Sequence, residues 1–496
     1  ISASLSSRLS GTFTIPTFGS IVAKGKLAIL TFSRVKALNK VDLPTLGKPT
    51  IPIFRFIIVL LCYNKIMLIN PSIFRAYDIR GIYPGELDEE TARQIGQAFA
   101  VYLKENEANK PEKVIVGYDS RVSSPVLKRS FIEGVTNEGV NVLDIGLSTV
   151  DAVYFASGYF HLPAAMITAS HNPKGWNGFK LMKSDIEFFA VQEWCAYGTS
   201  AGGREIIIGA NTPKNAAILK KGEVAREDIK ADYLKHVLSF IDTGTIRPMR
   251  IAINTSPGAV DSIIKLILEK LPLEINTNHY HFGCTFDGDG DRIIFVDERG
   301  ERVNSSIIGA LMARYFLKRY PYGKIVYSAT VSKIVSDVVN IYGGEAIRER
   351  VGHVFIEGRL KEIGGILGIE DSGHYYFKKN FYADSGIISF LVLLDILSNE
   401  KKSLSVLVSE LSKYVSIPEI NFKITNPQEF IKKIAQNFEG YEIDWLDGLT
   451  VRTEDFWLNI RPSNTESLVR LNIEAKDELV LERIKKDIMT LIERYK

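Results

Sequence analysis

Cysteine is scarce in this chain. Its 496 residues include three cysteines, Cys62, Cys195 and Cys284, and no two of them stand in a CxxC spacing. This usage excludes a disulfide framework and a zinc site built on thiolates, and it favours a reducing, cytoplasmic setting.

Long hydrophobic runs and a strong charge of one sign are also missing. The apolar run from Phe56 to Tyr63 is far shorter than the roughly 18–20 residues that a membrane span needs. The formal net charge is only +3 at pH 7, and a nucleic-acid-binding domain would carry a strongly basic surface. We therefore expect neither a membrane nor a nucleic acid as a partner.

Acidic residues are almost absent from the first 66 positions. This segment has nine Lys and Arg but a single acid, Asp42, and so contributes +8, whereas the 52 basic and 57 acidic residues of the remainder give −5. An acid-poor, Ser-rich composition is typical of a transit peptide. The first methionine, however, is Met67, and regular patterning starts there. We expect residues 1–66 to be a non-native or disordered extension, with Met67 the native start.

After Met67 the chain alternates strand-like and helix-like segments. Apolar runs at 113–117, 141–145 and 164–168 predict buried strands, and helical periodicity lies between them. This order is typical of βαβ units and mainly parallel sheets, whereas the pattern from about Ile417 is typical of an α+β layout with an antiparallel sheet. The sequence therefore predicts an α/β protein: three consecutive α/β domains with mixed, mainly parallel sheets, then a C-terminal α+β domain.

The expected boundaries are an extension at 1–66, followed by domains at 67–227, 228–320, 321–414 and 415–496. In parallel sheets, functional loops gather at the carboxyl ends of the strands. Both Ser120-Arg121 and Ser170-His171 follow predicted strands and should lie at that edge.

Ser170 is the first candidate for chemistry. It follows the apolar run 164–168 and precedes His171, Asn172 and Pro173, with Lys180 a few residues further on. A hydroxyl at the exit of a buried strand, beside backbone N–H groups and cations, suits a nucleophile or a phosphate carrier. The same residue types are also common in turns, so this stretch alone leaves both interpretations open.

Asp287, Asp289 and Asp291 alternate with glycines between two apolar segments. Three carboxylates so close together repel one another unless a cation neutralises them, and hard oxygen ligands suit Mg²⁺ or Ca²⁺. An EF-hand is disfavoured because Arg292 occupies the position that needs glycine and because the flanks are strand-like. The pattern favours a Mg²⁺ site over a solvated acidic turn, with Arg292 placed to hold a phosphoryl group.

Two later loops carry groups suited to a sugar phosphate. The loop 461–465 combines a guanidinium, two hydroxyls and an amide, although by itself it could be an ordinary turn. Glu370, Ser372 and His374 offer donors and acceptors of the kind that sugar hydroxyls need, a weak signal alone. His279 and His281 have no third ligand nearby in the sequence and are interpreted as structural.

Four loops in order carry a family resemblance. Thr-Ala-Ser-His-Asn-Pro, Asp-Gly-Asp-Gly-Asp-Arg, Glu-Asp-Ser-Gly-His and Arg-Pro-Ser-Asn-Thr resemble the four active-site loops of the α-D-phosphohexomutase family. The resemblance runs from about Phe74 to the C-terminus and includes Phe-Arg-Ala-Tyr-Asp-Ile-Arg-Gly and Asn-Gly-Phe-Lys. The last loop most resembles the phosphomannomutase/phosphoglucomutase branch, since phosphoglucosamine mutases tend to carry Gly where this chain has Asn464.

The resemblance implies four domains around a central cleft, contributing in turn the phosphoserine, the metal, the sugar contacts and a phosphate site. Ser170 would carry the phosphoryl group, and one Mg²⁺ per active site would be held by Ser170, Asp287, Asp289 and Asp291. Catalytic roles are implied for Ser170, His171, Lys180 and Arg292, with His171 and Lys180 as candidates for proton transfer. Substrate-binding roles are implied for Tyr77, Arg80, Arg350, Glu370, Ser372, His374, Arg461, Ser463, Asn464 and Thr465.

The implied reaction is reversible phosphoryl transfer between the 1- and 6-positions of a mannose or glucose phosphate. It would pass through a hexose 1,6-bisphosphate, which also serves as activator. The expected partner is the hexose phosphate alone, and the expected state is a monomer or weak dimer in the cytoplasm. The alternatives are a phosphoglucosamine mutase, an inactive sugar-phosphate-binding homologue and a simple Mg²⁺-dependent phosphatase.

Two departures from the family pattern bear on these expectations. Between 273–276 and 282–284 the family normally has a few dozen more residues, so the metal-binding domain is expected to be shortened and its sheet to close differently. Arg350 and Glu357 stand where relatives often have lysine. The first change keeps the charge, and the second reverses it and is expected to weaken contacts with the sugar phosphate.

Overall fold

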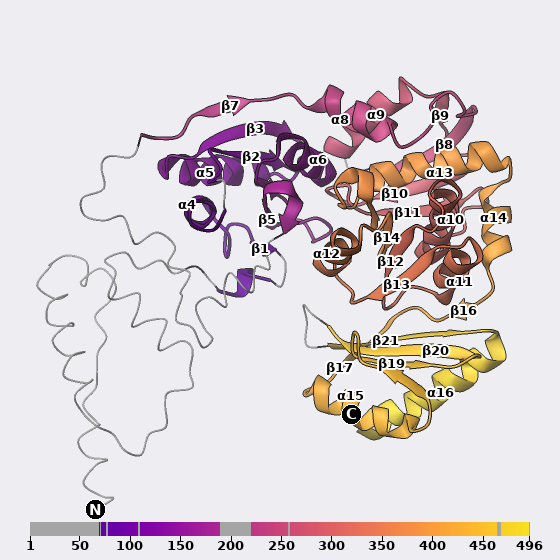
Figure 1. The fold of residues 1–496 in the computed structure, drawn as a ribbon. Coiled ribbons are helices and arrows are strands. Elements are labelled where there is room, and N and C mark those ends of the chain that lie inside the picture. The colour runs from indigo at the N-terminus through magenta and orange to yellow at the C-terminus, as the bar shows by residue number, and fades with distance from the viewer. Residues whose placement is uncertain are drawn as a thin grey trace, which may run out of the picture. The chain divides into compact units, whose positions relative to one another are not determined.

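The computed structural model describes residues 69, 71–75, 78–107, 110–188, 220–255, 258–463 and 468–495. The chain divides into two units, Ile1–Ile66 and Met67–Lys496, and the described residues all belong to the second (Figure 1). The predictions made for residues 1–66, Tyr77, Asn464 and Thr465 lie outside this part of the chain.

The first sheet has the strand order β1-β5-β4-β2-β3-β7, with β6 paired to β5. Its inner strands β2, β3 and β4 run parallel, and β5 joins β4 antiparallel. The strands are β1 Ile79–Ile82, β2 Lys113–Tyr118, β3 Asn141–Leu147, β4 Ala164–Ile167, β5 Trp176–Lys183, β6 Glu187–Phe188 and β7 Val224–Arg226. The helices that accompany them are α4 Glu89–Asn106, α5 Ser124–Asn137 and α6 Val150–Phe160.

Both faces of this sheet are buried, which explains the uninterrupted apolar run of β4. Ala164 and Met166 pack into the core that includes α6, whereas Ala165 and Ile167 pack into the core that includes α4 and α5. Side chains alternate across a strand, so a strand covered on both faces needs apolar residues at every position.

Helices α4 and α5 approach each other closely at two glycines. A Cβ at Gly96 would lie 2.2 Å from the carbonyl oxygen of Phe131, and one at Gly134 would lie 1.9 Å from that of Arg93. Only glycine permits this contact. It brings both helices down onto one face of the sheet that carries Ser170.

The second sheet has the order β11-β10-β8-β9. Its strands are β8 Met249–Asn254, β9 Leu273–Ile275, β10 Phe282–Phe286 and β11 Ile293–Asp297, and its helices are α8 Lys230–Leu238 and α9 Ala259–Leu268. The aspartates follow β10, in the hairpin between β10 and β11.

The register of this sheet explains how β9 connects to β10 without a helix. Both strands run parallel to β8, an arrangement that usually needs a crossover of a dozen or more residues. Here β9 ends with Ile275 opposite Ile251, and β10 starts with Phe282 opposite that same residue. The connection 276–281 therefore crosses β8 sideways and does not have to return along the sheet.

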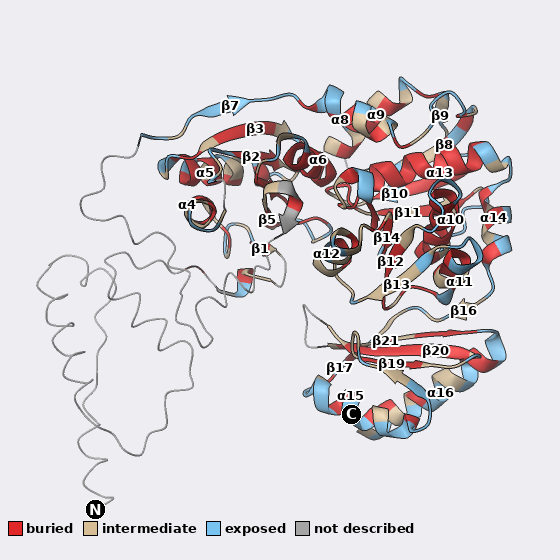
Figure 2. Ribbon diagram, in the orientation of Figure 1, coloured by how far each residue is buried: buried red, intermediate tan, exposed pale blue. Residues whose placement is uncertain are grey.

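The third sheet has the order β13-β12-β14-β15, with β12, β13 and β14 parallel. Its strands are β12 Lys324–Ser328, β13 Glu345–Glu349, β14 Leu367–Ile369 and β15 Tyr375–Phe377. The helices around it are α10 Ser305–Arg319, α11 Lys333–Ile341, α12 His353–Ile363, α13 Gly386–Glu400 and α14 Leu404–Leu411. Helix α13 is buried along almost its whole length, as Figure 2 shows, and packs against α8, α10 and β11.

The fourth sheet is antiparallel, in the order β16-β21-β20-β19-β18 with β17 paired to β21. Its strands are β16 Val415–Ser416, β17 Ile420–Lys423, β18 Glu442–Asp444, β19 Leu449–Arg452, β20 Phe456–Pro462 and β21 Leu468–Ala475, and its helices are α15 Pro427–Ala435 and α16 Glu478–Tyr495. The predicted fold class, mainly parallel α/β sheets followed by an antiparallel α+β domain, is confirmed. Within the described residues, no helix is both long and apolar enough to cross a membrane.

Candidate active site

Ser170 is buried in the turn after β4, with its backbone in the left-handed region at a φ of 49°. This conformation costs a non-glycine residue roughly 1–2 kcal/mol. Thr168 Oγ1 holds the turn by accepting the backbone N–H of Ser170 at 2.8 Å. Thr168 also donates to Asp289 Oδ2 at 3.2 Å, so the turn is fixed against the aspartate loop that follows β10.

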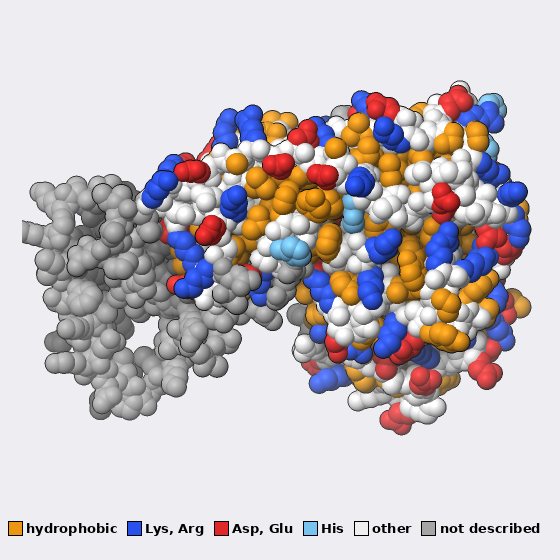
Figure 3. Space-filling view, turned by 45° about the horizontal axis from the view of Figure 1, so that its top comes forward, with side chains coloured by type: hydrophobic (Ala, Val, Ile, Leu, Met, Phe, Trp, Pro, Cys, Tyr) orange, Lys and Arg blue, Asp and Glu red, His pale blue; other side chains and the backbone are white. Residues whose placement is uncertain are grey.

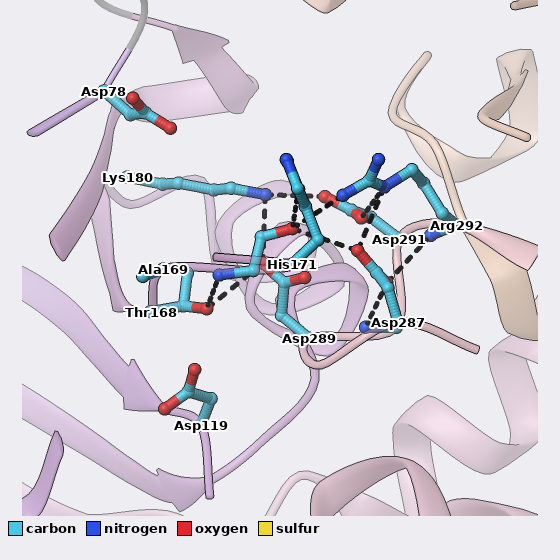
Figure 4. Close-up of polar contacts among 12 residues, drawn as sticks. Asp78, Asp119, Thr168, Ala169, His171, Lys180, Asp287, Asp289, Asp291 and Arg292 are labelled. Carbon is cyan, nitrogen blue, oxygen red and sulfur yellow. Dashed lines mark hydrogen bonds and ion pairs between the residues drawn. The ribbon is translucent and has the colours of Figure 1, made fainter. Parts of the chain in front are cut away.

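Three groups, which Figure 4 labels as His171, Asp287 and Arg292, surround the hydroxyl of Ser170. The hydroxyl donates to Asp287 Oδ2 at 2.9 Å, and Arg292 Nη2 donates to Ser170 Oγ at 3.4 Å. His171 Nδ1 lies 3.3 Å from the same oxygen. The guanidinium is the cation among them that can pair with a phosphoryl group, and the carboxylate is a ligand suited to a metal ion that would neutralise that group further.

The three aspartates form a compact cluster. One carboxylate oxygen from each lies within 4.8 Å of the others, and Asp289 and Asp291 are 0% and 2% exposed. Within the described part of the chain, Oδ1 of Asp289 and Oδ1 of Asp291 are buried without a hydrogen-bond partner. Unsatisfied buried carboxylate oxygens are costly, and a hard divalent cation is the ligand that such oxygens suit.

The electrostatics show how crowded the negative charge is. Burial, followed by the charges of Asp291 and Asp289, raises the pKa of Asp287 to about 7. Burial is the largest single influence on Asp291 and acts against its ionisation, but the charges of Lys180, His374 and Arg292 together outweigh it and hold the pKa of Asp291 well below its usual range. Lys180 Nζ lies 2.6 Å from Asp291 and 3.1 Å from Asp289, and Arg292 Nε lies 3.0 Å from Asp287.

The aspartate loop is fastened by segments outside its own sheet. The N–H of Val150, at the start of α6, donates to the carbonyl of Asp289 at 2.9 Å, and the N–H of Gly386, at the start of α13, donates to that of Gly290 at 3.1 Å. A Cβ at Gly288 would lie 2.7 Å from the carbonyl oxygen of Ser170. The serine turn and the aspartate loop are therefore packed directly together.

His374 adjoins the aspartate loop from the β14–β15 turn. It forms an isolated bridge with Arg292, and its Nδ1 lies 2.5 Å from Asp384 Oδ2. Burial opposes protonation, but Asp291 and Asp384 raise the pKa of His374 to about 9. His374 and Asp384 also form a possible metal-binding group with Asp291.

His171 differs from His374 in charge. Burial, with the neighbouring charges of Arg292 and Arg80, lowers the pKa of His171 to about 4. The two histidines predicted for the site therefore differ in protonation at neutral pH in the protein without ligands, His171 neutral and His374 charged.

Arg121 is the main contributor that the predicted site lacked. Its Nη2 donates to the carbonyls of Ser170 at 2.5 Å and Asn172 at 2.7 Å, and its Nη1 donates to those of Pro173 and Trp176, both at 3.1 Å. One guanidinium thus joins four carbonyls of the serine turn. The sequence indicated Arg121 only by its place after a strand. Asp384 was missed altogether, because no local pattern marks it.

Arg80 contacts the same turn from β1. Its Nη1 donates to the carbonyl of Ala169 at 3.1 Å and to Asn172 Oδ1, while its Nε pairs with Asp78 at 2.6 Å. This predicted substrate contact therefore lies next to Ser170.

The other residues predicted to contact sugar occupy mixed positions. Glu370 is buried, and its oxygens accept the N–H of Gly352 at 2.9 Å and the hydroxyl of Tyr376 at 2.6 Å. Ser372 is exposed in the turn that carries His374. Arg350 is exposed as well, with its guanidinium 3.8 Å from the ring centre of Phe355.

Arg461 and Ser463 lie at the end of β20, in the fourth sheet. Arg461 is buried, lies 3.5 Å from Glu419, and has an Nε without a hydrogen-bond partner among the described residues. Ser463 Oγ accepts from Arg470 at 3.3 Å. A buried guanidinium with an unused donor can take an anionic ligand.

Glu357, expected to weaken sugar-phosphate contacts, is buried on α12 and pairs with Lys361 Nζ at 2.5 Å. Lys361 in turn donates to the carbonyl of Ile186 at 2.6 Å. The local pair offsets the reversed charge at this position.

Family models match three segments of the chain. The models are described as "Phosphoglucomutase/phosphomannomutase, alpha/beta/alpha domain I" at residues 71–190, the corresponding domain III at 304–414, and the C-terminal domain at 419–491. Together they cover more than half of the sequence, and they include Ser170, the His374 loop and Arg461.

Whole-length relatives agree with these matches. The chain is 32% identical to "Phosphohexose mutases" of Xanthomonas campestris over 84% of this chain and 98% of that protein. It is 30% identical to a phosphomannomutase of Escherichia coli over 84% and 98%. A crystal structure of a phosphoglucomutase/phosphomannomutase family protein from Burkholderia thailandensis superposes with a TM-score of 0.73 at 26% identity, covering 86% of this chain and 98% of that one.

The order of the sheets, the buried serine beside a carboxylate cluster and these relatives all indicate the same class of protein. It is an enzyme of the isomerase class that transfers phosphoryl groups on hexose phosphates. The chain belongs to the phosphoglucomutase/phosphomannomutase family, the α-D-phosphohexomutases. The predicted family, enzyme class and place in carbohydrate metabolism are confirmed.

Proposed function

We propose that this enzyme interconverts the 1- and 6-phosphates of mannose and glucose, with Ser170 as the phosphoryl carrier. The observation that supports the proposal most is the 2.9 Å hydrogen bond from Ser170 Oγ to Asp287, beside Arg292 and two further aspartates. A phosphoryl group on Ser170 would lie among these charges, and positioning with charge neutralisation supplies most of phosphoryl-transfer catalysis.

The donor set fits one Mg²⁺ per active site. Asp287, Asp289 and Asp291 would hold the ion together with the phosphorylated Ser170, and the two unsatisfied Oδ1 atoms support this assignment. When bound, Mg²⁺ supplies positive charge to the phosphoryl oxygens.

The forward transfer would proceed in two balanced steps. The sugar 6-hydroxyl oxygen forms a bond to phosphorus as the bond from phosphorus to Ser170 Oγ breaks, and the hydroxyl proton passes to a base on the protein. The hexose 1,6-bisphosphate then turns over. Ser170 Oγ forms a bond to the phosphorus of the 1-phosphate as the bond from that phosphorus to the sugar 1-oxygen breaks, and the base returns the proton to the 1-oxygen. Arg461, Ser463 and the rest of the loop 461–465 would hold the phosphate that is not being transferred.

His171 and Lys180 have different roles in this proposal. Lys180 is buried beside two carboxylates that keep its pKa well above the usual value despite burial, so it acts as a fixed positive charge. His171 is the neutral group beside Ser170 Oγ and can accept the proton. The negative charge of a phosphoserine would raise its pKa from the ligand-free value and make it a better base.

Replacement of the carrier tests the proposal directly. In a coupled assay with mannose 1-phosphate or glucose 1-phosphate, Mg²⁺ and catalytic hexose 1,6-bisphosphate, Ser170→Ala should lower kcat by at least about a thousandfold. Mass spectrometry should find a phosphate on the wild-type peptide containing Ser170 and none on the variant peptide. Metal removal with a chelator should abolish turnover, and added Mg²⁺ should restore it.

Several results of the same assay would contradict the proposal. Equal turnover by wild type and Ser170→Ala would exclude Ser170 as carrier. Release of inorganic phosphate without isomerisation would identify a phosphatase. Faster turnover of glucosamine phosphate would identify the phosphoglucosamine branch, and no turnover of any sugar by a folded, unphosphorylated chain would identify an inactive homologue.

The predicted location, partner and oligomeric state of the enzyme are part of the same proposal. A cytoplasmic location rests on the scarcity of cysteine. The hexose phosphate as sole partner and the monomeric or weakly dimeric state rest on the family resemblance.

A further inference from the structure

A cavity of about 130 Å³ lies at the end of the second sheet that is opposite the aspartates. It is lined by Arg247, Arg250, Tyr280, His281, Glu298, Leu397, Lys402, Ser403 and Leu404. His281 directly precedes β10 and Asp287 directly follows it, so the two ends are separated by five extended residues, or about 17 Å. The cavity is therefore separate from the candidate active site.

The sideways connection between β9 and β10 forms part of this cavity. Residues 276–281 contribute Tyr280 and His281, while the α13–α14 connection contributes Lys402 and Ser403. Figure 3 shows pale blue histidine beside blue basic side chains at the upper right, on the side where Figure 1 draws β9. Segments far apart in the sequence thus bring several hydrogen-bond donors to one place.

The lining has more positive than negative charge, and its one acid is already engaged. Glu298 accepts hydrogen bonds from the backbone N–H of Ser405 at 3.1 Å and from the Ser405 hydroxyl, at the start of α14. Lys402 pairs with Glu410. These contacts leave the positive charges of Arg247 and Arg250 without a paired carboxylate among the described residues.

The two arginines have unused donors. Within the described residues, Arg247 Nε is buried without a hydrogen-bond partner, and no carboxylate pairs with the exposed guanidinium of Arg250. A buried charged donor without a partner costs more than a neutral one, and a planar guanidinium binds a tetrahedral oxyanion through two parallel hydrogen bonds. The hydroxyl of Tyr280 adds a neutral donor at the same place, whereas that of Ser403 is already in contact with Ser405 and Glu298.

We propose that this cavity binds a phosphate dianion, either free or carried by a small phosphorylated metabolite, independently of the active site. The guanidinium groups of Arg247 and Arg250 supply the charge, and the hydroxyl of Tyr280 supplies a further hydrogen bond. A neutral ligand would leave both arginines uncompensated, and a single carboxylate has fewer acceptor oxygens than this set of donors can use.

Phosphate-binding stoichiometry tests this proposal in the full chain. Titration calorimetry with inorganic phosphate should resolve a site that Arg250→Gln weakens at least tenfold, while turnover of hexose phosphate at low phosphate stays at the wild-type rate. Arg250 is exposed, so this variant should fold, and Arg247→Gln should have the same effect if its thermal unfolding is unchanged. Arg129→Gln, which removes an exposed cation from α5, is the matched control and should bind as the wild type does.

A second ligand separates the two sources of the dianion. Glycerol 3-phosphate, which is not a hexose phosphate, should compete for the Arg250-dependent site if the site takes phosphate monoesters. If it does not compete while inorganic phosphate binds, the site takes the free ion. Equal phosphate binding by wild type and Arg250→Gln, or an equal loss in Arg129→Gln, would overturn the proposal.

Discussion

At the scale of single residues, Arg121 illustrates how a side chain outside the reacting groups can determine where they lie. Its guanidinium joins four carbonyls of the turn that holds Ser170 in a left-handed conformation. The motif around Ser170 marks the proposed phosphoryl carrier because serine, histidine and asparagine are chemically distinctive. Carbonyl acceptors belong to every residue, so the sequence contains no sign of which carbonyls Arg121 binds.

Arg121→Lys should separate positioning from folding. A lysine keeps the charge, but its single ammonium has three donors and cannot join all four carbonyls, so the turn should lose its fixed geometry. We expect kcat to fall about 10–100-fold with KM within about twofold, since small misplacements of reacting atoms are costly.

The control for this variant is Arg129→Lys on α5, at an exposed position, which should retain wild-type kcat. Unchanged kcat in Arg121→Lys would show that the turn holds Ser170 without the guanidinium. A drop explained wholly by unfolding, visible as a lower thermal midpoint and less folded protein, would also contradict a positioning role.

At the scale of elements, helix α13 and the aspartate loop are directly hydrogen-bonded to each other. The loop lies between two strands of the second sheet, yet it is hydrogen-bonded to the first turn of α13 and to the start of α6. The sequence predicted the strands and the loop correctly because their patterns are local. It predicted a shortened domain whose sheet closes differently, but not the support that the loop receives from α6 and α13, because contacts between residues a hundred positions apart have no local pattern.

Gly386→Ala should displace the proposed metal ligands, Asp287, Asp289 and Asp291, although it replaces none of them. A Cβ there would lie 2.7 Å from the carbonyl oxygen of Gly290 and 3.1 Å from that of Arg292, so the loop would have to shift. We expect the Mg²⁺ concentration for half-maximal turnover to rise about tenfold, corresponding to about 1.4 kcal/mol of lost binding.

Gly358→Ala on α12 is the matched control, because nothing lies within 4 Å of its added Cβ. It should leave the Mg²⁺ dependence unchanged and stabilise the helix by up to about 1 kcal/mol. If both variants show the same Mg²⁺ dependence as the wild type, the contact with α13 does not position the aspartates.

At the scale of the whole molecule, a buried carboxylate joins segments from different sheets. Asp151 is 0% exposed on α6 and accepts hydrogen bonds from Tyr233 on α8 at 2.6 Å, from Ser385 before α13 at 2.5 Å, and from Thr149. Burial raises its pKa from 3.8 to about 6, although the three hydroxyls act in the opposite direction. Nothing local in the sequence marks this junction, since its members come from positions 149 to 385.

The raised pKa of Asp151 predicts a pH-dependent stability. The folded protein holds the proton more tightly than the unfolded chain, so the contribution is fully present below pH 4 and is lost as the pH rises from about 4 through about 6. The loss should approach about 3 kcal/mol, and Asp151→Asn should remove this part of the pH dependence.

Urea unfolding at pH 5 and pH 7.5 measures this effect. The stability difference between the two pH values should be smaller in Asp151→Asn than in the wild type. Asp228→Asn, at an exposed position, should keep the wild-type difference. An unchanged difference in Asp151→Asn would show that this carboxylate does not control the pH response.

Because α13 supports the aspartate loop, a fragment of this chain needs α13 if it is to keep the loop in place. A fragment ending before Ser385 would keep Ser170 and all three aspartates, yet it would lack the first turn of α13 that receives the loop. The metal affinity of this fragment, measured with and without a second fragment that contains α13, would then show whether α13 had restored the loop. Substitutions in the first turn of α13, which lies far in sequence from Ser170 and the aspartates, would therefore raise the magnesium requirement of the proposed enzyme.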